Sequence, residues 1–455
     1  MLLILVFRIL QNYRQFLNKL LIFNDITVTD EISVKICQTI SSSSSSISDY
    51  LSEMSYSSKT SRPYQQSSKN LMQFTEIYPT NDKLSGPSPR SGHRAVITDS
   101  DLWLWGGYFP RQVNQNESMF RELWRYNFAM KRWTKEETAG DGPSLTLASH
   151  AVCLHRNLMF VFGGTGFPFG QHGSNDLYTL NLKQRIWKRH KLLKELPGKV
   201  YGASMLIKDK YLYILCGTNS LQYNSDVYQI NLSTMESKKI GHTFDEIEEP
   251  SDAGRYRQEV VLHNDKIFVF GGGGISGISF SLKLIPIFDL DTHLWSFCKT
   301  TPDPVHSYPS ERKFHSVFKI SENRLLMFGG AHFDTQLNQH VLVEKHLWSF
   351  DLNKLEWTML PIEMPMPTYF HASAINQRGE IWTHGGVLLT DNDHDSDEIN
   401  ERRISNLFMI YVRPMTLQEI AWSNFVTKIL DKNILKKHSL LLHSMIPQKF
   451  LNRMH

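Results

Sequence analysis

The chain has 455 residues, of which 41% are hydrophobic and 21% charged, so it is long enough to bury a large core. Its formal net charge is +4 and both signs are spread along the chain, which argues against a nucleic-acid partner. The four cysteines form no CxxC pair, and three of them lie on or beside predicted strands. We therefore expect buried thiols and a cytoplasmic or nuclear location.

The first 70 residues are predicted to lie outside the folded domain. Residues 1–7 are apolar, but Arg8 and Arg14 interrupt the stretch well short of the roughly 20 residues of a membrane span, so no membrane partner is expected. The basic residues follow the apolar stretch, whereas a signal peptide begins with them, which leaves an amphipathic segment or a misassigned start. Residues 41–46 are six serines, and we expect a disordered, Ser-rich linker over 30–70.

From residue 71 onward, a hydrophobic strand ending in Gly-Gly or a close variant occurs six times. A fixed period near 50 residues is typical of blades repeated around an axis. The successive strand ends start 57, 53, 55, 58 and 56 residues apart and are Trp103–Gly107, Phe160–Gly164, Tyr213–Gly217, Phe268–Gly272, Leu326–Gly330 and Trp382–Gly386.

The second repeat illustrates one predicted blade. Residues 150–154 alternate into a first strand, and the mostly apolar residues 158–162 form a second strand that is buried on both faces. Gly163-Gly164 ends this strand, and a polar loop leads to a third strand over 176–182 and a fourth around Trp187. Four antiparallel strands make one blade.

The third repeat departs from this pattern, because Ser237 or Lys238 replaces the fourth-strand Trp and the glycine pair is Cys216-Gly217. We interpret this change as tolerated drift. The sixth repeat has a third strand over 406–412 but then Pro414 in place of a fourth strand. Residues 74–78 precede the first repeat as a fourth strand precedes each later one, so both termini are expected to complete the sixth blade.

These features resemble the Kelch repeat family, whose hallmarks are the Gly-Gly pair, a Tyr or Phe near Asp/Asn-Leu, and the trailing Trp. The repetition covers about 340 residues, so the signal is strong. It predicts an all-β, six-bladed propeller over residues 71–413. In such propellers, the segments before each first strand and the loops after the glycine pairs surround the mouth of the central channel.

Arginines in those segments are the candidate binding residues. Arg90, Arg255 and Arg312 occupy the same place in their repeats, so several guanidinium groups would converge on a carboxylate, which Arg binds with two parallel hydrogen bonds. The alternative is that these arginines only bridge neighbouring blades. The predicted carboxylate-binding residues, in order of preference, are Arg255 and Arg257, then Arg90, Arg312 and Tyr201, with residues 165–170 as a wall of the pocket.

No catalytic or metal-binding pattern stands out, so neither an enzyme nor a cofactor is predicted. The acidic loop at residues 391–398 lacks the glycine and the final glutamate of a calcium loop, because position twelve is Arg402. The repeat histidines are expected to make structural hydrogen bonds between blades, and they are His93, His150, His315 and His371.

After Pro414 the hydrophobic pattern acquires a helical period, which predicts a helical tail over 414–455 with a second helical stretch from about residue 439 to 454. Thr416 and Glu419 have the spacing of a capping box. One interpretation is a helix packed on the underside of the propeller. The other is a docking helix, since Thr-Leu-x-x-x-Ala-x-x-x-Phe is similar to the BC box that binds elongin C. The match is partial, because Ala421 replaces a cysteine and Phe425 an aliphatic residue.

The resemblance extends to a group of Kelch proteins that act as substrate receptors of cullin-2 ubiquitin ligases. It implies that the propeller binds C-terminal degrons with small final residues, and that the tail binds elongin B/C and cullin-2. The alternative is a cytoskeletal or signalling scaffold without a ligase role. The stretches that carry the resemblance are 123–126, 162–170, 255–257, 369–371 and 417–422, and the implied elongin-binding residues are Thr416, Leu417, Ile420, Ala421 and Phe425.

Overall fold

The computed structural model places the following residues: 72–79, 86–110, 119–144, 147–241, 254–334, 336–337, 339–390, 400–416, 419–420, 422 and 453. The predicted N-terminal extension over residues 1–70 lies outside the described residues. Most of the predicted helical tail, including Leu417, Ala421 and Phe425, lies outside them as well. None of the described residues belongs to a helix long and apolar enough to cross a membrane.

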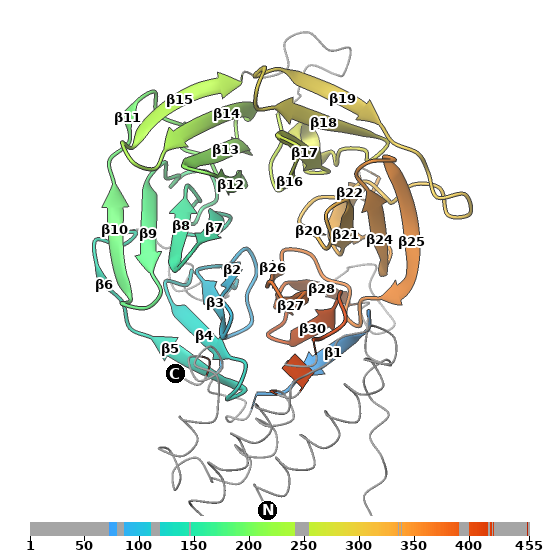
Figure 1. The fold of residues 1–455 in the computed structure, drawn as a ribbon, viewed down its shortest axis with the longest axis horizontal. Helices are drawn as coiled ribbons and strands as arrows, with labels where there is room; N and C mark the ends of the chain where they lie inside the picture. The colour runs from blue at the N-terminus through green and yellow to red at the C-terminus, as the bar shows by residue number, and fades with distance from the viewer. Residues whose placement is uncertain are drawn as a thin grey trace, which may run out of the picture. The chain divides into compact units, whose positions relative to one another are not determined.

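Six antiparallel sheets surround a central axis (Figure 1). Blade one comprises β2 (Arg94–Ile97), β3 (Asp101–Trp105), β4 (Leu123–Asn127) and β5 (Arg132–Glu136). Blade two comprises β7 (Ala151–His155), β8 (Leu158–Phe162), β9 (Leu177–Asn181) and β10 (Ile186–His190). Blade three comprises β12 (Ser204–Lys208), β13 (Tyr211–Thr218), β14 (Tyr223–Asn231) and β15 (Glu236–Gly241).

Blade four comprises β16 (Glu259–His263), β17 (Lys266–Phe270), β18 (Leu284–Asp289) and β19 (Trp295–Lys299). Blade five comprises β20 (Ser316–Lys319), β21 (Arg324–Phe328), β24 (His346–Asp351) and β25 (Glu356–Glu363). Blade six comprises β26 (Ala372–Ile375), β27 (Glu380–His384), β30 (Leu407–Tyr411) and β1 (Phe74–Ile77). Two hairpins extend the loops after β21 and β27, and they are β22 (Ala331–Asp334) with β23 (Gln339–Leu342), and β28 (Val387–Thr390) with β29 (Asn400–Arg403). Two short strands, β6 (Ala139–Gly140) and β11 (Leu193–Lys194), add to the edges of blades two and three.

The sixth blade is completed by strands from opposite ends of the domain. β1 pairs antiparallel with β30, with Phe74 opposite Ile410 and Ile77 opposite Leu407. Figure 1 shows β1 lying along the outside of blade six. The predicted all-β fold, its six blades and their closure by both termini are therefore confirmed. Closure matters because it removes an open sheet edge that could pair with another chain.

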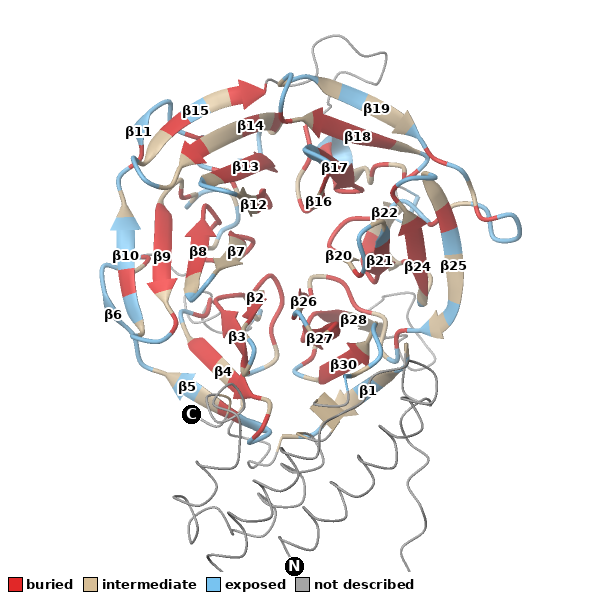
Figure 2. Ribbon diagram, viewed as in Figure 1, coloured by how far each residue is buried: buried red, intermediate tan, exposed pale blue. Residues whose placement is uncertain are grey.

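Burial follows the strand order within each blade. The second strands are almost wholly buried, whereas outer strands such as β5 and β10 alternate between buried and exposed residues (Figure 2). The buried member of β10 is Trp187, whose ring lies 5.4 Å from that of Trp105 in blade one. Ser237 has the register position of Trp187 in blade three, and it is also buried. The fourth-strand Trp thus packs one blade against the preceding one.

The glycine pairs are required by close packing between neighbouring blades. Gly106 and Gly107 have φ of +72° and +102°. A Cβ at Gly106 would lie 2.6 Å from the Leu147 carbonyl and 2.9 Å from His150 of the next blade, and one at Gly107 would lie 2.8 Å from His93 of its own blade. In blade one the pair is therefore a point where strand end, next blade and repeat histidine meet, and a Cβ would be strained there. In blade three, Cys216 occupies the first position at a φ of +62°.

We predict that Gly106→Ala lowers the free energy of unfolding by at least about 2 kcal/mol, because positive φ and steric overlap both oppose a Cβ. The matched control is Gly198→Ala, whose Cβ would meet no atom nearer than 3.9 Å and which should change stability by less than about 0.5 kcal/mol. Chemical denaturation of both variants measures the difference. Equal midpoints for the two would contradict this account of the Gly-Gly pair.

Candidate functional site at the mouth of the propeller

A closed ring of backbone hydrogen bonds surrounds the axis at one end of the central channel, and we call it the axial ring. Each blade contributes one residue, whose N–H donates to the carbonyl of the ring residue in a neighbouring blade, with N···O distances of 2.7–3.3 Å. All six residues have positive φ, between +55° and +68°. The ring residues are Gly92, Ser149, Gly202, Arg257, Phe314 and Phe370.

The residue before each ring member forms a bridge with the residue that follows the glycine pair of the same blade. The segments before the first strands and the loops after the glycine pairs therefore lie on one face, the mouth, as predicted for a Kelch propeller. The six bridges are Ser91–Tyr108, Ala148–Thr165, Tyr201–Thr218, Tyr256–Gly273, Lys313–Ala331 and Tyr369–Val387.

Arg90 and Arg312 occupy equivalent places, but both are fully buried and have partners within their own blades. Arg90 donates to the Gly106 carbonyl at 3.2 Å and forms a 2.8 Å ion pair with Glu122. Arg312 donates to the Gly329 carbonyl at 3.2 Å and pairs with Glu344. Both carboxylates also accept a hydrogen bond from a tryptophan indole, Trp124 at 2.8 Å and Trp348 at 2.7 Å.

These ion pairs are strong enough to change the acidity of their members. Burial by itself opposes ionisation of Glu122, but hydrogen bonds from Lys135, Trp124 and Arg90 lower its pKa to about 2. In blade four, Arg255 also donates to the first glycine carbonyl, that of Gly271 at 3.1 Å, and its guanidinium stacks 3.6 Å from the Phe280 ring centroid. The three repeat-equivalent arginines thus brace the loops of the mouth from within the core.

Arg257 differs, because it belongs to the axial ring and its side chain reaches the ring residues of two other blades. Its guanidinium donates to Ser149 Oγ at 2.7 Å and to the Gly92 carbonyl at 3.4 Å, and lies 4.8 Å from the Phe370 ring centroid. Only 3% of the residue is exposed, and Glu259, which attracts it electrostatically, forms its ion pair with Arg94 at 3.4 Å instead. Burial lowers the pKa of Arg257 well below its ordinary value. The predicted role of Arg255, Arg257, Arg90 and Arg312 in binding a carboxylate stays a prediction.

Lys313, which the sequence analysis did not select, is a second cation of this kind. It is 1% exposed, precedes the ring residue Phe314, and donates to the Gly277 carbonyl at 2.8 Å. Among the described residues, no carboxylate forms an ion pair with it, and burial lowers its pKa to about 8. The sequence signal that could have identified Lys313 is its place in the repeat, because the five other blades carry Ser, Ala or Tyr at the equivalent position.

Aromatic rings surround these two cations. The rings of Tyr256, Phe314 and Phe333 have centroids 5.4–5.7 Å from Lys313 Nζ. Tyr201, the remaining predicted site residue, is partly exposed, packs 6.1 Å from Tyr256, and has its hydroxyl 2.7 Å from Ser220 Oγ. These rings create the low-dielectric surroundings in which a buried ion pair is strong.

The loop over residues 165–170 forms another aromatic cluster of the mouth. Thr165 is fully buried, and its Oγ1 accepts a 2.8 Å hydrogen bond from the Gly170 amide, which closes the loop. Phe167 stacks on Tyr108 of blade one with 5.8 Å between centroids, and Phe169 is 43% exposed. The loop therefore presents an apolar surface beside the axial ring.

The repeat histidines lie beneath the mouth and are buried. His93 lies 3.1 Å from His384 within the axial packing of blades one and six, and His371 lies 3.0 Å from Ser316 of blade five. These two contacts bear out the expected hydrogen bonding for His93 and His371, while no hydrogen-bond partner is described for the ring nitrogens of His150 and His315. No group of three or more potential metal ligands occurs in the described part of the chain.

Comparison with known proteins agrees with the fold. A family model, the KLHDC2/KLHL20/DRC7 Kelch-repeats domain, matches residues 68–272, so the chain is a Kelch-repeat propeller. Kelch domain-containing protein 10 of Xenopus tropicalis is 33% identical over 361 residues, covering 78% of this chain and 83% of the relative. The human protein of that name is 32% identical over 374 residues, covering 81% and 80%. A Drosophila melanogaster homolog is 30% identical over 394 residues, covering 81% and 62%. The chain belongs to the Kelch domain-containing protein 10 family.

We predict that Glu344→Gln lowers the free energy of unfolding by roughly 2–3 kcal/mol, because it leaves the buried Arg312 guanidinium without its counter-charge. The matched control is Glu363→Gln, which alters a half-exposed ion pair with Lys345 and should cost less than about 1 kcal/mol. Denaturant titration compares the two. A loss no larger than that of the control would show that the Arg–Glu–Trp contacts do not brace the loops.

Proposed function

We propose that the protein is a substrate-recognition subunit of a cullin-2–elongin B/C ubiquitin ligase, and that the mouth of its propeller binds C-terminal tails of other proteins. The observation that supports this proposal is a pair of buried cations, Arg257 and Lys313, with no ion-pair partner among the described residues. Both belong to the mouth. Arg257 is a ring residue, and Lys313 precedes the ring residue Phe314, whose N–H donates to the Arg257 carbonyl.

A free C-terminus is the chemistry that suits such a pair. A buried charge without an ion pair is unfavourable, and Glu259, which attracts Arg257, is already paired with Arg94. An incoming carboxylate would relieve that cost for both cations. Arg257 Nε and Nη2 already donate to Ser149 and Gly92, so Arg257 Nη1 and the Lys313 ammonium are the proposed donors to the carboxylate oxygens. The rings of Tyr256, Phe314 and Phe370 leave little room beside the carboxylate, which favours a small final residue.

This proposal changes the predicted order of the carboxylate contacts. Arg257 keeps its place, and Lys313 is added from another blade. Arg90 and Arg312 have their own glutamates, so we assign them to bracing the mouth. Arg255 supports the loop after β17, and Tyr201 and the loop over residues 165–170 provide the neighbouring wall.

The ligase role also needs a partner for the tail. The proposed contacts with elongin C are Leu417, Ala421 and Phe425, flanked by Thr416 and Ile420, and cullin-2 would bind the following stretch. Such a complex acts in the cytoplasm or nucleus, and the three described cysteines are free thiols, which suits a reducing compartment. A scaffold without ligase activity is the alternative, and it would bind partners at the mouth without elongin B/C.

A peptide titration tests the mouth. A peptide ending in a free Gly or Ala carboxylate should bind at least about tenfold more tightly than its C-terminal amide, because the amide has lost the charge. Lys313→Met and Arg257→Met should each reduce affinity for the free acid by a similar factor, while Lys266→Met, at a half-exposed position at the start of β17 and away from the mouth, should not. Calorimetry with the full chain measures these differences. Equal affinity for acid and amide would remove the C-degron proposal and favour the scaffold.

The affinity should also depend on pH through Lys313, whose pKa of about 8 is below that of an ordinary lysine. Bound carboxylate favours the charged amine, so affinity should be constant below about pH 7 and fall by up to about tenfold per pH unit above pH 8. In Lys313→Met this dependence should be absent between pH 7 and 9.5. A wild-type affinity that does not change over that range would exclude Lys313 as a contact.

Substitution of the tail tests the ligase role separately. Leu417→Asp with Ala421→Asp should abolish co-purification of elongin B/C without changing the melting temperature of the propeller or peptide binding at the mouth. Retained elongin binding together with a large drop in melting temperature would instead favour a tail that only packs on the propeller.

A further inference from the structure

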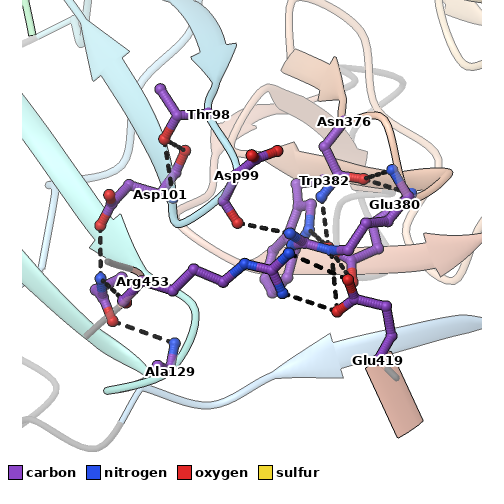
Figure 3. A network of polar contacts seen from close by, with 11 residues as sticks. Thr98, Asp99, Asp101, Ala129, Asn376, Glu380, Trp382, Glu419 and Arg453 are labelled. Carbon is purple, nitrogen blue, oxygen red and sulfur yellow. Dashed lines mark hydrogen bonds and ion pairs between the residues drawn. The ribbon is translucent and has the colours of Figure 1, made fainter. Parts of the chain in front are cut away.

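The start and the end of the tail meet on the underside of the propeller, at blades one and six (Figure 3). Glu419 and Arg453 are 34 residues apart, yet they form a two-fold ion pair, with Nη1–Oε2 and Nη2–Oε1 distances of 2.8 and 3.1 Å. Their side chains are only 14% and 11% exposed. Both belong to the same compact unit as the propeller.

The propeller contributes its own partners to this pair. Arg378, in the turn between β26 and β27, lies 4.0 Å from Glu419 and makes two hydrogen bonds to Glu380 at 3.2 and 2.7 Å. The same guanidinium donates to the Asp99 carbonyl of blade one at 2.6 Å. Two arginines and two glutamates therefore form one neutral, largely buried network.

The end of the tail has a second attachment. The Arg453 carbonyl accepts a 3.2 Å hydrogen bond from the Asn127 amide at the end of β4, and this amide also donates to Asp101 at 2.8 Å. A cavity of about 240 Å³ beside these contacts is lined by propeller residues such as Phe128 and Trp382 together with the tail residue Trp422. Tail and propeller thus share apolar as well as charged contacts.

Glu419 also differs from the capping box expected at this position. Its amide donates to Thr416 Oγ1 at 3.3 Å, which is half of the predicted box. Its carboxylate, however, is bound to Arg453 and lies near Arg378 instead of returning to the Thr416 amide. A capping box would stabilise a helix start alone, whereas this arrangement attaches the start of the tail to the propeller.

We propose that the underside of blades one and six is a binding surface for the chain's own tail, which we call the receptor. Glu419 makes its central charged contacts, with Arg453 and near Arg378. The receptor therefore holds the start of the tail, at Glu419, on the propeller. This attachment does not rest on the proposed function.

Hydrogen exchange of the purified full chain, without any partner, tests the receptor. Glu419→Gln and Arg453→Gln remove one charge each, and both should accelerate amide exchange over residues 415–425 by at least about tenfold while β3, β27 and β30 remain protected. The double variant should exchange no faster than either single variant, because one interaction has been lost. Glu363→Gln, in a half-exposed pair of blade five, is the control and should change nothing in the tail.

An unchanged rate of amide exchange over residues 415–425 in Glu419→Gln would contradict the proposed receptor. Faster exchange that extends through β27 and β30 would overturn it as well, because the network would then belong to the propeller core. Elongin binding is measured on the same proteins as a separate readout. A protected tail that binds no elongin contradicts only the ligase proposal, whereas an unprotected tail that binds elongin contradicts only the receptor.

Discussion

The axial ring is the interaction on which the rest of the structure depends. Six N–H groups and six carbonyls, one of each from every blade, form a closed cycle that links all six blades. The cycle requires positive φ at each ring residue, a conformation that most side chains disfavour. It is sustained by the bridges to the loops after the glycine pairs and by the arginines beneath them. The pairing of β1 with β30 completes blade six and so helps to hold all six blades in this cycle.

The ring also shapes the proposed binding site at the mouth. The ring members of blades one to three are small, namely Gly92, Ser149 and Gly202. The Arg257 side chain of blade four donates hydrogen bonds to the first two of them. In the proposed site, a ligand would meet a floor of ring residues at the mouth. The chemistry of that floor comes from the residues on and just before the ring, and these vary between blades while the backbone repeats. The proposal thus assigns binding specificity and fold to different parts of the same repeat.

Much of this architecture was predictable from sequence because it depends on local, repeated signals. The Gly-Gly pairs, the trailing Trp and the unpaired strand at residues 74–78 were sufficient for six blades and their closure. Three arginines were placed correctly within their repeats, but their burial was not foreseen, and for Arg90 and Arg312 it depends on glutamates 32 residues later, Glu122 and Glu344. That equal spacing in two repeats is the signal that could have indicated paired, structural arginines.

Other features have no periodic signal. Lys313 becomes distinctive only when six equivalent positions are compared, since a lysine before a phenylalanine is unremarkable in itself. The Glu419–Arg453 pair joins residues that no repeat or helix spacing relates, and the capping-box pattern suggested a different use for Glu419. Contacts of this kind depend on tertiary packing, which brings the tail to the turn that carries Arg378.

The central claim is that the mouth contains a desolvated ammonium group awaiting an anionic partner. The most direct measurement is the pKa of Lys313 itself, from NMR titration of labelled lysine side chains assigned with Lys313→Met. We expect a pKa near 8 in the free protein, and a rise of at least about one unit when a peptide with a free C-terminus saturates the mouth, but none with the amide. An ordinary lysine pKa in the free protein, or one unaffected by the saturating free-acid peptide, would contradict the account.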